Sequence, residues 1–256
     1  MVRLNWLKAD LHVHTVLSPC AELDMGPQGL VTAALNRGLN ILGVTDHNAW
    51  ANVAAVTELA QPYGIGVLPG IEVQTREEVH VLCFFPDLDQ LAAAGEHIYA
   101  SLPAIRNRAD IFGDQIIVDA KENIVAFEER MLLNSVELSL EQLRDLTCRH
   151  GGIIIPAHVD RPAFSLIANL GFVPPDLKPA ALEISTRLDE ERARKRFPAL
   201  EGYTLVTSSD AHCLGDFGTP RSTFFYVAAP TLAEIALACA GRKNRKVVIA
   251  SEGTIF

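Results

Sequence analysis

The stretch Asp10-Leu11-His12-Val13-His14 lies near the start of this 256-residue chain and is typical of a β-strand. Successive side chains of a strand point to opposite faces, so His12 and His14 face the same way. Two neighbouring neutral imidazoles form half of a divalent-metal site, and Asp10, on the same face, is placed to orient a ligand. The stretch therefore predicts a metal site at the end of a strand, provided that the rest of the chain supplies further ligands.

Strands and helices alternate along most of the chain. The expected strands span 7–14, 41–47, 66–73, 79–85, 152–159, 181–185, 203–208, 222–227 and 247–250. The expected helices span 27–39, 52–63, 90–101, 139–149, 165–170, 190–197 and 231–240. This order predicts an α/β fold with parallel strands joined by helical crossovers. The stretch 87–150 is less regular but has no linker composition at either end, so we expect one domain over 1–256 with 87–150 as an elaboration within it.

The overall composition narrows the class of protein. Hydrophobic residues make up 49% of the chain and charged residues 21%, which excludes a disordered protein. No apolar run approaches the ~20 residues of a transmembrane helix, and the N-terminus lacks an apolar signal segment. The five cysteines have irregular spacing and no CxxC pair, which favours reduced thiols. We therefore expect a cytoplasmic protein without a membrane partner.

The formal net charge of −9 bears on possible partners. Broad electrostatic binding of nucleic acid needs a basic surface, so we expect no long nucleic acid among the partners. A small phosphorylated substrate or a short oligonucleotide stays possible, because bound metal ions invert the local sign of a site.

Six of the eight histidines fall at or just past the ends of expected strands, or on a strand beside such an end. They are His12, His14, His47, His80, His158 and His212. Acidic residues accompany them at Asp46, Glu72 and Asp210. In parallel α/β folds the carboxyl ends of the strands meet at one edge, where sites are built. This placement predicts a metal centre, whereas His97 and His150 lie on expected helices and are interpreted as surface or packing residues.

The same residues fall in motifs that resemble those of a known family. In order, these motifs are Asp10-Leu11-His12-Val13-His14-Thr15, Thr45-Asp46-His47-Asn48, Pro69-Gly70-Ile71-Glu72-Val73, Pro156-Ala157-His158 and Ser209-Asp210-Ala211-His212. Together they resemble the PHP (polymerase and histidinol phosphatase) superfamily, in the form of its stand-alone metal-dependent phosphoesterases. The resemblance implies a distorted (β/α)7 barrel with a trinuclear metal site at the C-terminal ends of its strands.

The resemblance also implies ligands for three divalent ions, which we expect to be zinc, manganese or iron. For the first ion the implied ligands are His12, His14, Glu72 and Asp210. For the second they are Glu72, as a bridge, with His80 and His158. For the third they are His47, His212 and one further residue, with Cys20 as first candidate and Glu22 and Asp24 as competitors. A Cys20 thiolate would favour zinc, and the alternative role for Cys20 is a small buried thiol.

The implied reaction is hydrolysis of a small phosphorylated metabolite or nucleotide by a metal-bridged hydroxide. Glu72 would bridge two metals, while Asp210 and His212 would act as ligands and proton carriers. Arg161 is the first candidate for binding the phosphate, and an ion pair with Asp160 is its alternative role.

Two other functions stay open. Amidohydrolase-type barrels, which cleave C–N or C–O bonds, also begin with His-x-His but often bridge their metals with a carboxylated lysine. No lysine lies in the expected strands between 66 and 85 or in 152–159, which disfavours that reaction. A non-catalytic metal-stabilised PHP module is the other alternative, and the retention of nearly all ligand positions favours an enzyme over it. The sequence leaves the substrate, the choice between monoester and diester, and the oligomeric state open.

Overall fold

The computed structural model describes residues 2–251 and 253–254 of the chain. Its strands are β1 (Asn5–Val13), β2 (Ile41–Val44), β3 (Gly66–Gln74), β4 (His80–Phe84), β5 (Ile116–Val118), β6 (Ile124–Phe127), β7 (Ile153–Pro156), β8 (Leu182–Ile184), β9 (Leu205–Thr207), β10 (Arg221–Val227) and β11 (Lys246–Ser251). Its α-helices are α1 (Pro27–Asn36), α2 (Val53–Ala60), α3 (Leu88–Ala100), α4 (Ala109–Phe112), α5 (Leu140–Arg149), α6 (Leu166–Leu170), α7 (Glu190–Arg196) and α8 (Leu232–Cys239).

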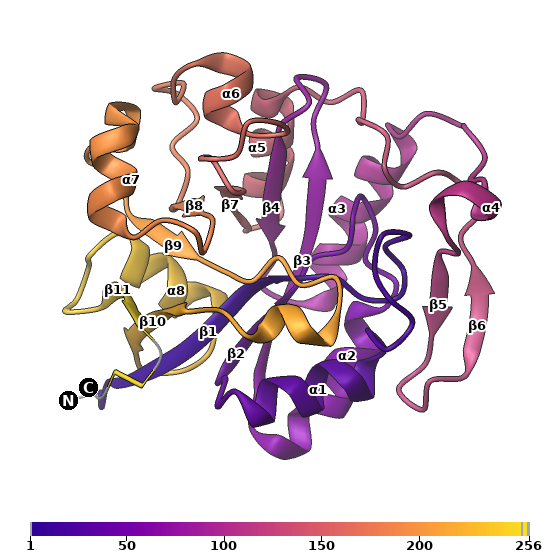
Figure 1. The fold of residues 1–256 in the computed structure, drawn as a ribbon, viewed down its shortest axis with the longest axis horizontal. Helices are drawn as coiled ribbons and strands as arrows, with labels where there is room; N and C mark the ends of the chain where they lie inside the picture. The colour runs from indigo at the N-terminus through magenta and orange to yellow at the C-terminus, as the bar shows by residue number, and fades with distance from the viewer. Residues whose placement is uncertain (1, 252, 255–256) are drawn as a thin grey trace.

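A curled sheet with the order β11-β10-β1-β2-β3-β4-β7 forms the centre of the fold (Figure 1). The parallel pair β8–β9 completes a ring with it. On one side, the Ala180 N–H before β8 donates to the Ile154 carbonyl of β7 at 3.0 Å. On the other, a parallel bridge joins Ala211, after β9, to Val13 of β1. Within the described residues, the ring β1-β2-β3-β4-β7-β8-β9 is thus a distorted barrel, and the predicted α/β fold class is confirmed.

Strand β4 runs against both of its neighbours, and the expectation of parallel strands is wrong here. It pairs antiparallel with β3 and with β7, and the arrows of β3 and β4 point in opposite directions in Figure 1. The connection from β3 to β4 is a tight turn in which the Thr75 N–H donates to the Val79 carbonyl at 2.9 Å. So short a connection joins antiparallel strands, because a parallel crossover needs about a dozen residues. As a result His80, the first residue of β4, lies at the same end of the barrel as the carboxyl ends of β1, β2 and β3.

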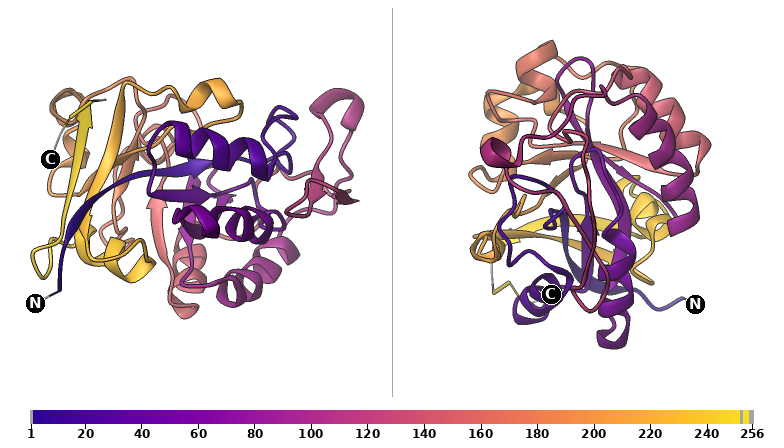
Figure 2. Two further views of the ribbon diagram at one scale, coloured as in Figure 1. Left: turned by 90° about the horizontal axis from the view of Figure 1, so that it is seen from below. Right: turned by 90° about the vertical axis from the view of Figure 1, so that its right-hand side faces the viewer.

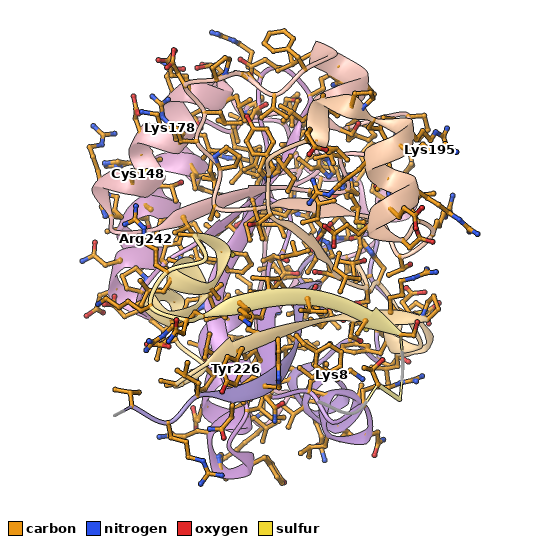
Figure 3. All side chains as sticks on the ribbon, turned by 90° about the vertical axis from the view of Figure 1, so that its left-hand side faces the viewer. Lys8, Cys148, Lys178, Lys195, Tyr226 and Arg242 are labelled. Atoms are coloured by element: carbon orange, nitrogen blue, oxygen red, sulfur yellow. The ribbon has the colours of Figure 1, made fainter. Side chains whose placement is uncertain are left out.

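The last two strands lie outside the ring. Strand β10 pairs antiparallel with β1 and with β11, so it lies between the first and the last strand of the chain (Figure 1). Tyr226 of β10 and Lys8 of β1 mark these strands in Figure 3, and the Tyr226 ring packs 5.0 Å from that of Trp6.

Buried apolar residues form two clusters, and the alternation of strand side chains divides them. In β4, Val81 and Cys83 join the cluster that the strands share with α1, α2, α3 and α5. Leu82 and Phe84 join the second cluster, which collects strand residues from around the ring. Helix α8 adds Leu232, Ile235, Ala238 and Cys239 to this second cluster. The barrel interior is therefore filled by apolar side chains, and the histidines lie at the strand ends.

The segment 87–150 contains α3 and α5, which pack on the strands, together with the hairpin β5–β6 and α4. Helix α5 starts with a capping box in which Ser139 and Gln142 each accept the other's backbone N–H, at 3.2 and 2.9 Å. The hairpin β5–β6 and α4 stand out from the body of the molecule in Figure 1 and in the left view of Figure 2. Among the described helices, none combines the length and apolar character needed to cross a membrane.

Candidate metal centre

The strand ends bring nine predicted ligands into one region: His12, His14, Cys20, His47, Glu72, His80, His158, Asp210 and His212. Glu72 lies at its centre with 1% of its surface exposed. Its Oε1 atom lies 2.8 Å from His80 Nδ1 and 3.2 Å from His12 Nε2, and its Oε2 atom lies 2.9 Å from His47 Nδ1. One carboxylate from β3 thus contacts imidazoles from three other segments, which is the arrangement expected of a bridging ligand.

Asp210 supplies a second carboxylate. Its Oδ1 atom lies 3.1 Å from His12 Nε2 and 3.3 Å from His14 Nε2. Its backbone adopts φ +55°, a left-handed conformation that costs stability and is common at functional sites. Asp10 supports this turn, since its Oδ1 accepts the Ser209 N–H at 3.1 Å. The expectation that Asp10 orients a ligand from outside the ligand set therefore fits its position, although it acts through the backbone next to Asp210.

The third group of side chains surrounds Cys20. The His14 and His212 rings stack with centroids 4.1 Å apart, and His14 lies 4.5 Å from the His47 ring. Partial desolvation by its neighbours opposes ionisation of the Cys20 thiol, but hydrogen bonds with His212 and His47 outweigh it and lower the pKa of Cys20 to about 7. Cys20 is exposed rather than a buried thiol, and the competing carboxylates of Glu22 and Asp24 are exposed too.

Three sets of side chains place their ligand atoms within 4.8 Å of one another: His12–His14–Asp210, His47–Glu72–His80 and His14–His47–His212. His158 completes the region, with Nε2 3.4 Å from Glu72 Oε1. Because the sets share His14 and His47, each expected ligand lies in the cluster, while the division of ligands among individual ions stays a proposal.

Glu183 of β8 is a functional candidate that the sequence patterns did not single out. Its Oε1 atom lies 3.1 Å from His12 Nδ1 and accepts the His158 N–H at 3.0 Å. On the other side of the site, His14 Nδ1 lies 3.0 Å from Ser18 Oγ, which donates to Asp46 at 2.7 Å. Metal-ligating histidines have their second ring nitrogen held in this way, which fixes tautomer and ring orientation. The only signal for Glu183 was a buried carboxylate inside an otherwise apolar strand.

Arg161 lies beside the carboxylates. Its Nη1 atom is 2.6 Å from Asp210 Oδ2, and 42% of its side chain is exposed. Asp160, the alternative ion-pair partner, is engaged elsewhere. Its carboxylate accepts hydrogen bonds from the backbone N–H and the hydroxyl of Ser185 at 2.7 and 2.6 Å. Arg161 therefore presents a cation at the mouth of the cluster.

The donor set fits divalent metal ions. The Nε2 atoms of His12 and His14 lie 3.2 Å apart, so they face one another as in a ligand pair. Burial, reinforced by His212 and His47, lowers the pKa of His14 well below its ordinary value, which favours the neutral imidazole that binds metals. Burial alone would raise the pKa of Glu72, but the neighbouring His80, His12 and His47 hold it well below the usual range.

Orphaned polar atoms support the same conclusion. Glu72 Oε2 and His158 Nδ1 are buried without a well-aligned hydrogen bond, although Glu72 Oε2 lies 2.9 Å from His47 Nδ1. Buried polar atoms are ordinarily hydrogen-bonded, so atoms of this kind need an explanation such as an ion. Metal ions held by the cluster would supply the missing partner for the carboxylate.

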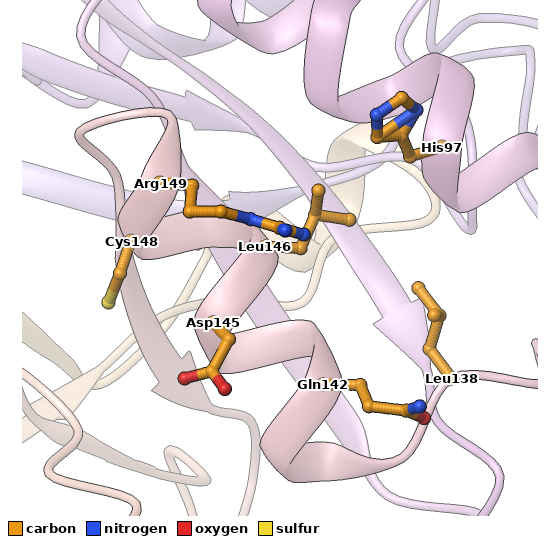
Figure 4. Close-up of a pocket in the computed structure, with 7 residues that line it drawn as sticks. All are labelled: His97, Leu138, Gln142, Asp145, Leu146, Cys148 and Arg149. Atoms are coloured by element: carbon orange, nitrogen blue, oxygen red, sulfur yellow. The ribbon is translucent and has the colours of Figure 1, made fainter.

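A hollow of the surface lies away from the cluster. A hollow of about 770 Å³ between α3 and α5 is lined by His97, Leu138, Gln142, Asp145, Leu146, Cys148 and Arg149 (Figure 4). None of the predicted ligands lines it, and its walls are outer helix surfaces. Volume alone therefore does not identify the site in this fold.

Comparisons with known proteins agree with the motifs. The model of the PHP domain family matches residues 10–150. The chain is 25% identical over 254 residues to the uncharacterized protein YqxK of Bacillus subtilis (strain 168), which covers 94% of this chain and 63% of YqxK.

Two solved structures share the fold. The lesion-specific endonuclease PfuEndoQ from Pyrococcus furiosus matches with a TM-score of 0.74 and 22% identity, over 96% of this chain and 59% of that one. An endonuclease Q in complex with a 27-mer duplex substrate, with an abasic lesion at the active site, matches with a TM-score of 0.64 and 20% identity, over 94% of this chain and 58% of that one. The chain spans less than two thirds of the length of these relatives.

The expectation that long nucleic acid is excluded as a partner is wrong. Endonuclease Q carries this fold and is seen with a 27-mer duplex at its active site. A net charge of −9 sums the whole chain, whereas bound cations and nearby arginines set the sign of the potential within a site. Net charge therefore does not exclude a duplex from a barrel of this kind.

Proposed function

The chain belongs to the PHP domain family, and from this premise we propose that it is a metal-dependent phosphoesterase with its active centre at Glu72 and Asp210. The observation that carries the proposal is the position of Glu72, 1% exposed and within 3.2 Å of imidazole nitrogens of His12, His47 and His80. A buried carboxylate shared among imidazoles is an established kind of site for two or more divalent ions.

His12, His14, Glu72 and Asp210 would hold one ion. Glu72, as a bridge, would hold a second ion with His80 and His158. His47 and His212 would hold a third ion with Cys20. Ions bound here supply an activated water and offset the negative charge of a phosphoryl group. We propose zinc, manganese or iron, since imidazole and carboxylate ligands accept all three, and a thiolate at Cys20 favours zinc.

The remaining steps belong to the chain's own side chains. Arg161 is half exposed and turns its guanidinium toward Asp210, so an incoming phosphate would meet a planar, permanently charged donor at the mouth of the site. His212, with 27% of its side chain exposed, is the most open of the site histidines that have ion-pair contacts. Burial lowers the pKa of His212, but Cys20 and Asp210 outweigh this and raise it, so His212 would carry a proton to the leaving oxygen.

We propose a phosphate ester of a nucleotide as the substrate, either free or within a strand of nucleic acid. The related endonuclease Q has been captured with a 27-mer duplex substrate that carries an abasic lesion at the active site, which supports a strand as the source. An amidohydrolase reaction is disfavoured because β3 and β4 contain no lysine that could be carboxylated to bridge two metals.

The test is a hydrolysis screen with metal-replete protein. The panel contains phosphomonoesters, phosphodiesters, single-stranded and duplex oligonucleotides with and without base lesions, and an amide and a lactone. We expect hydrolysis of a phosphate ester that chelators abolish, and a loss of more than about a hundredfold in Glu72→Gln and Asp210→Asn. Glu234→Gln is the matched control, because Glu234 lies on α8, outside the site, and pairs with Arg245. Hydrolysis of the amide or lactone alone, or full activity in Glu72→Gln, would overturn the proposal.

A further inference from the structure

The loop between β7 and α6 supplies three different groups to the mouth of the metal centre. His158 provides a candidate ligand, Arg161 contacts Asp210, and Phe164 lies against His80. Local hydrogen bonds make the loop compact: the Arg161 N–H donates to the His158 carbonyl at 2.9 Å, and the Ser165 hydroxyl donates to the Arg161 carbonyl at 2.7 Å. Each of the three groups is thus held at a defined position relative to the others.

Phe164 is the group in this loop that the phosphoesterase chemistry does not use. Its ring stacks on the His80 imidazole with centroids 5.0 Å apart and an interplanar angle of 24°. Its carbonyl accepts the His80 N–H at 3.0 Å, which fixes the backbone beside the strand. His80 in turn contacts Glu72 at 2.8 Å. The phenyl ring therefore lies one side chain away from the central carboxylate.

The backbone conformation of Phe164 is energetically unfavourable, and its side chain belongs to neither buried apolar cluster. The residue adopts φ +54°, a left-handed conformation that is rare for a bulky side chain. Its side chain is 45% exposed, so much of its apolar surface stays in water. Positions that break local rules in this way are often functional sites.

We propose that Phe164 is a specificity-determining residue that stacks on a nucleobase of the substrate while Arg161 binds the neighbouring phosphate. One face of the phenyl ring packs on His80, and the exposed part of the ring is available for a planar partner. Bases stack on aromatic side chains in a sequence-tolerant way, because every base has a π-face. This inference rests on the proposed function for the position of the phosphate and extends it to the base.

The test measures binding and needs no turnover. The metal-loaded protein is titrated calorimetrically with adenosine 5′-monophosphate and with ribose 5-phosphate, which differ only in the base. A second pair, a short oligothymidylate and the same strand with abasic residues, distinguishes a strand from a free nucleotide as the source of the base. We expect the base-containing ligand of at least one pair to bind about tenfold more tightly.

The variants separate stacking from structural support. Phe164→Ala and Phe164→Leu are expected to remove the preference for the base, Phe164→Trp to keep it, and all three to bind the base-free ligands as the wild type does. Phe172→Ala is the control, since Phe172 is exposed after α6 at 55%. For a nucleotide ester that the protein hydrolyses, Phe164→Ala should raise KM about tenfold and leave kcat unchanged.

Three results would overturn the inference. The first is no preference for the base in the wild type. The second is an unchanged preference in Phe164→Ala and Phe164→Leu. The third is an equal loss of affinity for base-containing and base-free ligands, which would mark Phe164 as a support for His80 alone. Base-dependent binding without hydrolysis of any phosphate ester would refute the proposed function and leave this inference standing.

Discussion

At the residue scale, the chemistry of the site is built from groups that restrain one another. His12 contacts Glu72 and Asp210 through Nε2 and Glu183 through Nδ1, so both ring nitrogens are engaged. The side chains of the cluster were predictable, because a histidine or carboxylate at a strand end is a visible pattern. Glu183 was not, because a single buried carboxylate in a strand carries no spacing signal and its partner lies 171 residues away.

Glu183 gives the first prediction. In Glu183→Gln the charge that holds the His12 imidazole is lost while the shape of the side chain is kept, so metal affinity should fall by about 10–100-fold. Equilibrium dialysis against a competing chelator measures the affinity, and circular dichroism checks that the fold is intact. The exposed Glu201→Gln is the control, and wild-type affinity in Glu183→Gln would show that Glu183 supports structure only.

The thiol of Cys20 gives a prediction of pH dependence. The thiolate is the reactive form, and with a pKa of about 7 its fraction rises as pH rises through neutrality. Alkylation of Cys20 in the metal-free protein should therefore be half-maximal near pH 7 and should slow below it, as followed by peptide mass spectrometry. Burial raises the pKa of Cys83 and of Cys239 to about 12, so these two thiols serve as unreactive references.

Bound metal extends the same experiment. If Cys20 completes the third set of ligands, added zinc should protect it from alkylation, and Cys20→Ser should lower the metal content of the protein. Unchanged metal content together with undiminished alkylation would transfer the role to Glu22 or Asp24.

At the scale of elements, the position of His80 depends on the direction of β4. The apolar run at 79–85 predicted a strand, and β4 spans His80–Phe84, but its direction was not visible in the pattern. The direction of a strand depends on the length of its connection and on its pairing partner. The short turn at Thr75 makes β4 pair with β3 and run antiparallel to it. The reversal matters for function, because a parallel β4 would carry His80 to the far end of the barrel.

Asn48 shows how one side chain can fasten an element to the site. Asn48 precedes helix α2, but no side-chain hydrogen bond caps that helix. Instead its Nδ2 donates to the carbonyls of Leu132 and Asn134 at 2.7 and 2.9 Å, and its Oδ1 accepts the Gln74 N–H at 3.2 Å. The segment after β6 is thereby joined to the end of β3, a link between distant parts of the chain that no local pattern reveals.

These contacts predict the effect of Asn48→Ala. Three hydrogen bonds, one buried and two part-buried, lose their partner, so the free energy of unfolding should fall by about 1–3 kcal/mol. Urea denaturation followed by fluorescence measures it, with the exposed Asn36→Ala as the control. A stability equal to that of the wild type would mean that solvent replaces the lost partners and that Asn48 does not fasten the segment.

At the scale of the whole molecule, the apolar clusters stabilise the fold, while the buried polar groups at the strand ends destabilise it. Buried carboxylates and imidazoles such as Glu72 and His14 are expensive to remove from water, and bound cations offset this cost. Composition predicted an ordered α/β protein, whereas the sum of charges misled about nucleic acid. The sum fails because the potential at a site depends on where charged groups such as Arg161 lie, and not on the total of −9.

Removing the metal should therefore lower the stability of the whole chain. A ligand that binds only the folded state adds RT ln(1 + [L]/Kd), or about 4 kcal/mol at a thousandfold excess over Kd. Differential scanning calorimetry should show a lower Tm after chelation and recovery after zinc or manganese is added back. A Tm unaffected by chelation would mean that the cluster holds no metal in the folded protein.

The position of the metal ions is the measurement that decides most directly whether the cluster is a multinuclear centre. We propose anomalous diffraction from crystals of the manganese- or zinc-loaded protein, collected on both sides of the metal absorption edge. Two or three peaks should appear within the cluster, at least one of them between Glu72 and the imidazoles of His12 and His80. Saturated protein with no peak beside Glu72, or with peaks only at the surface, would contradict the assignment of this site.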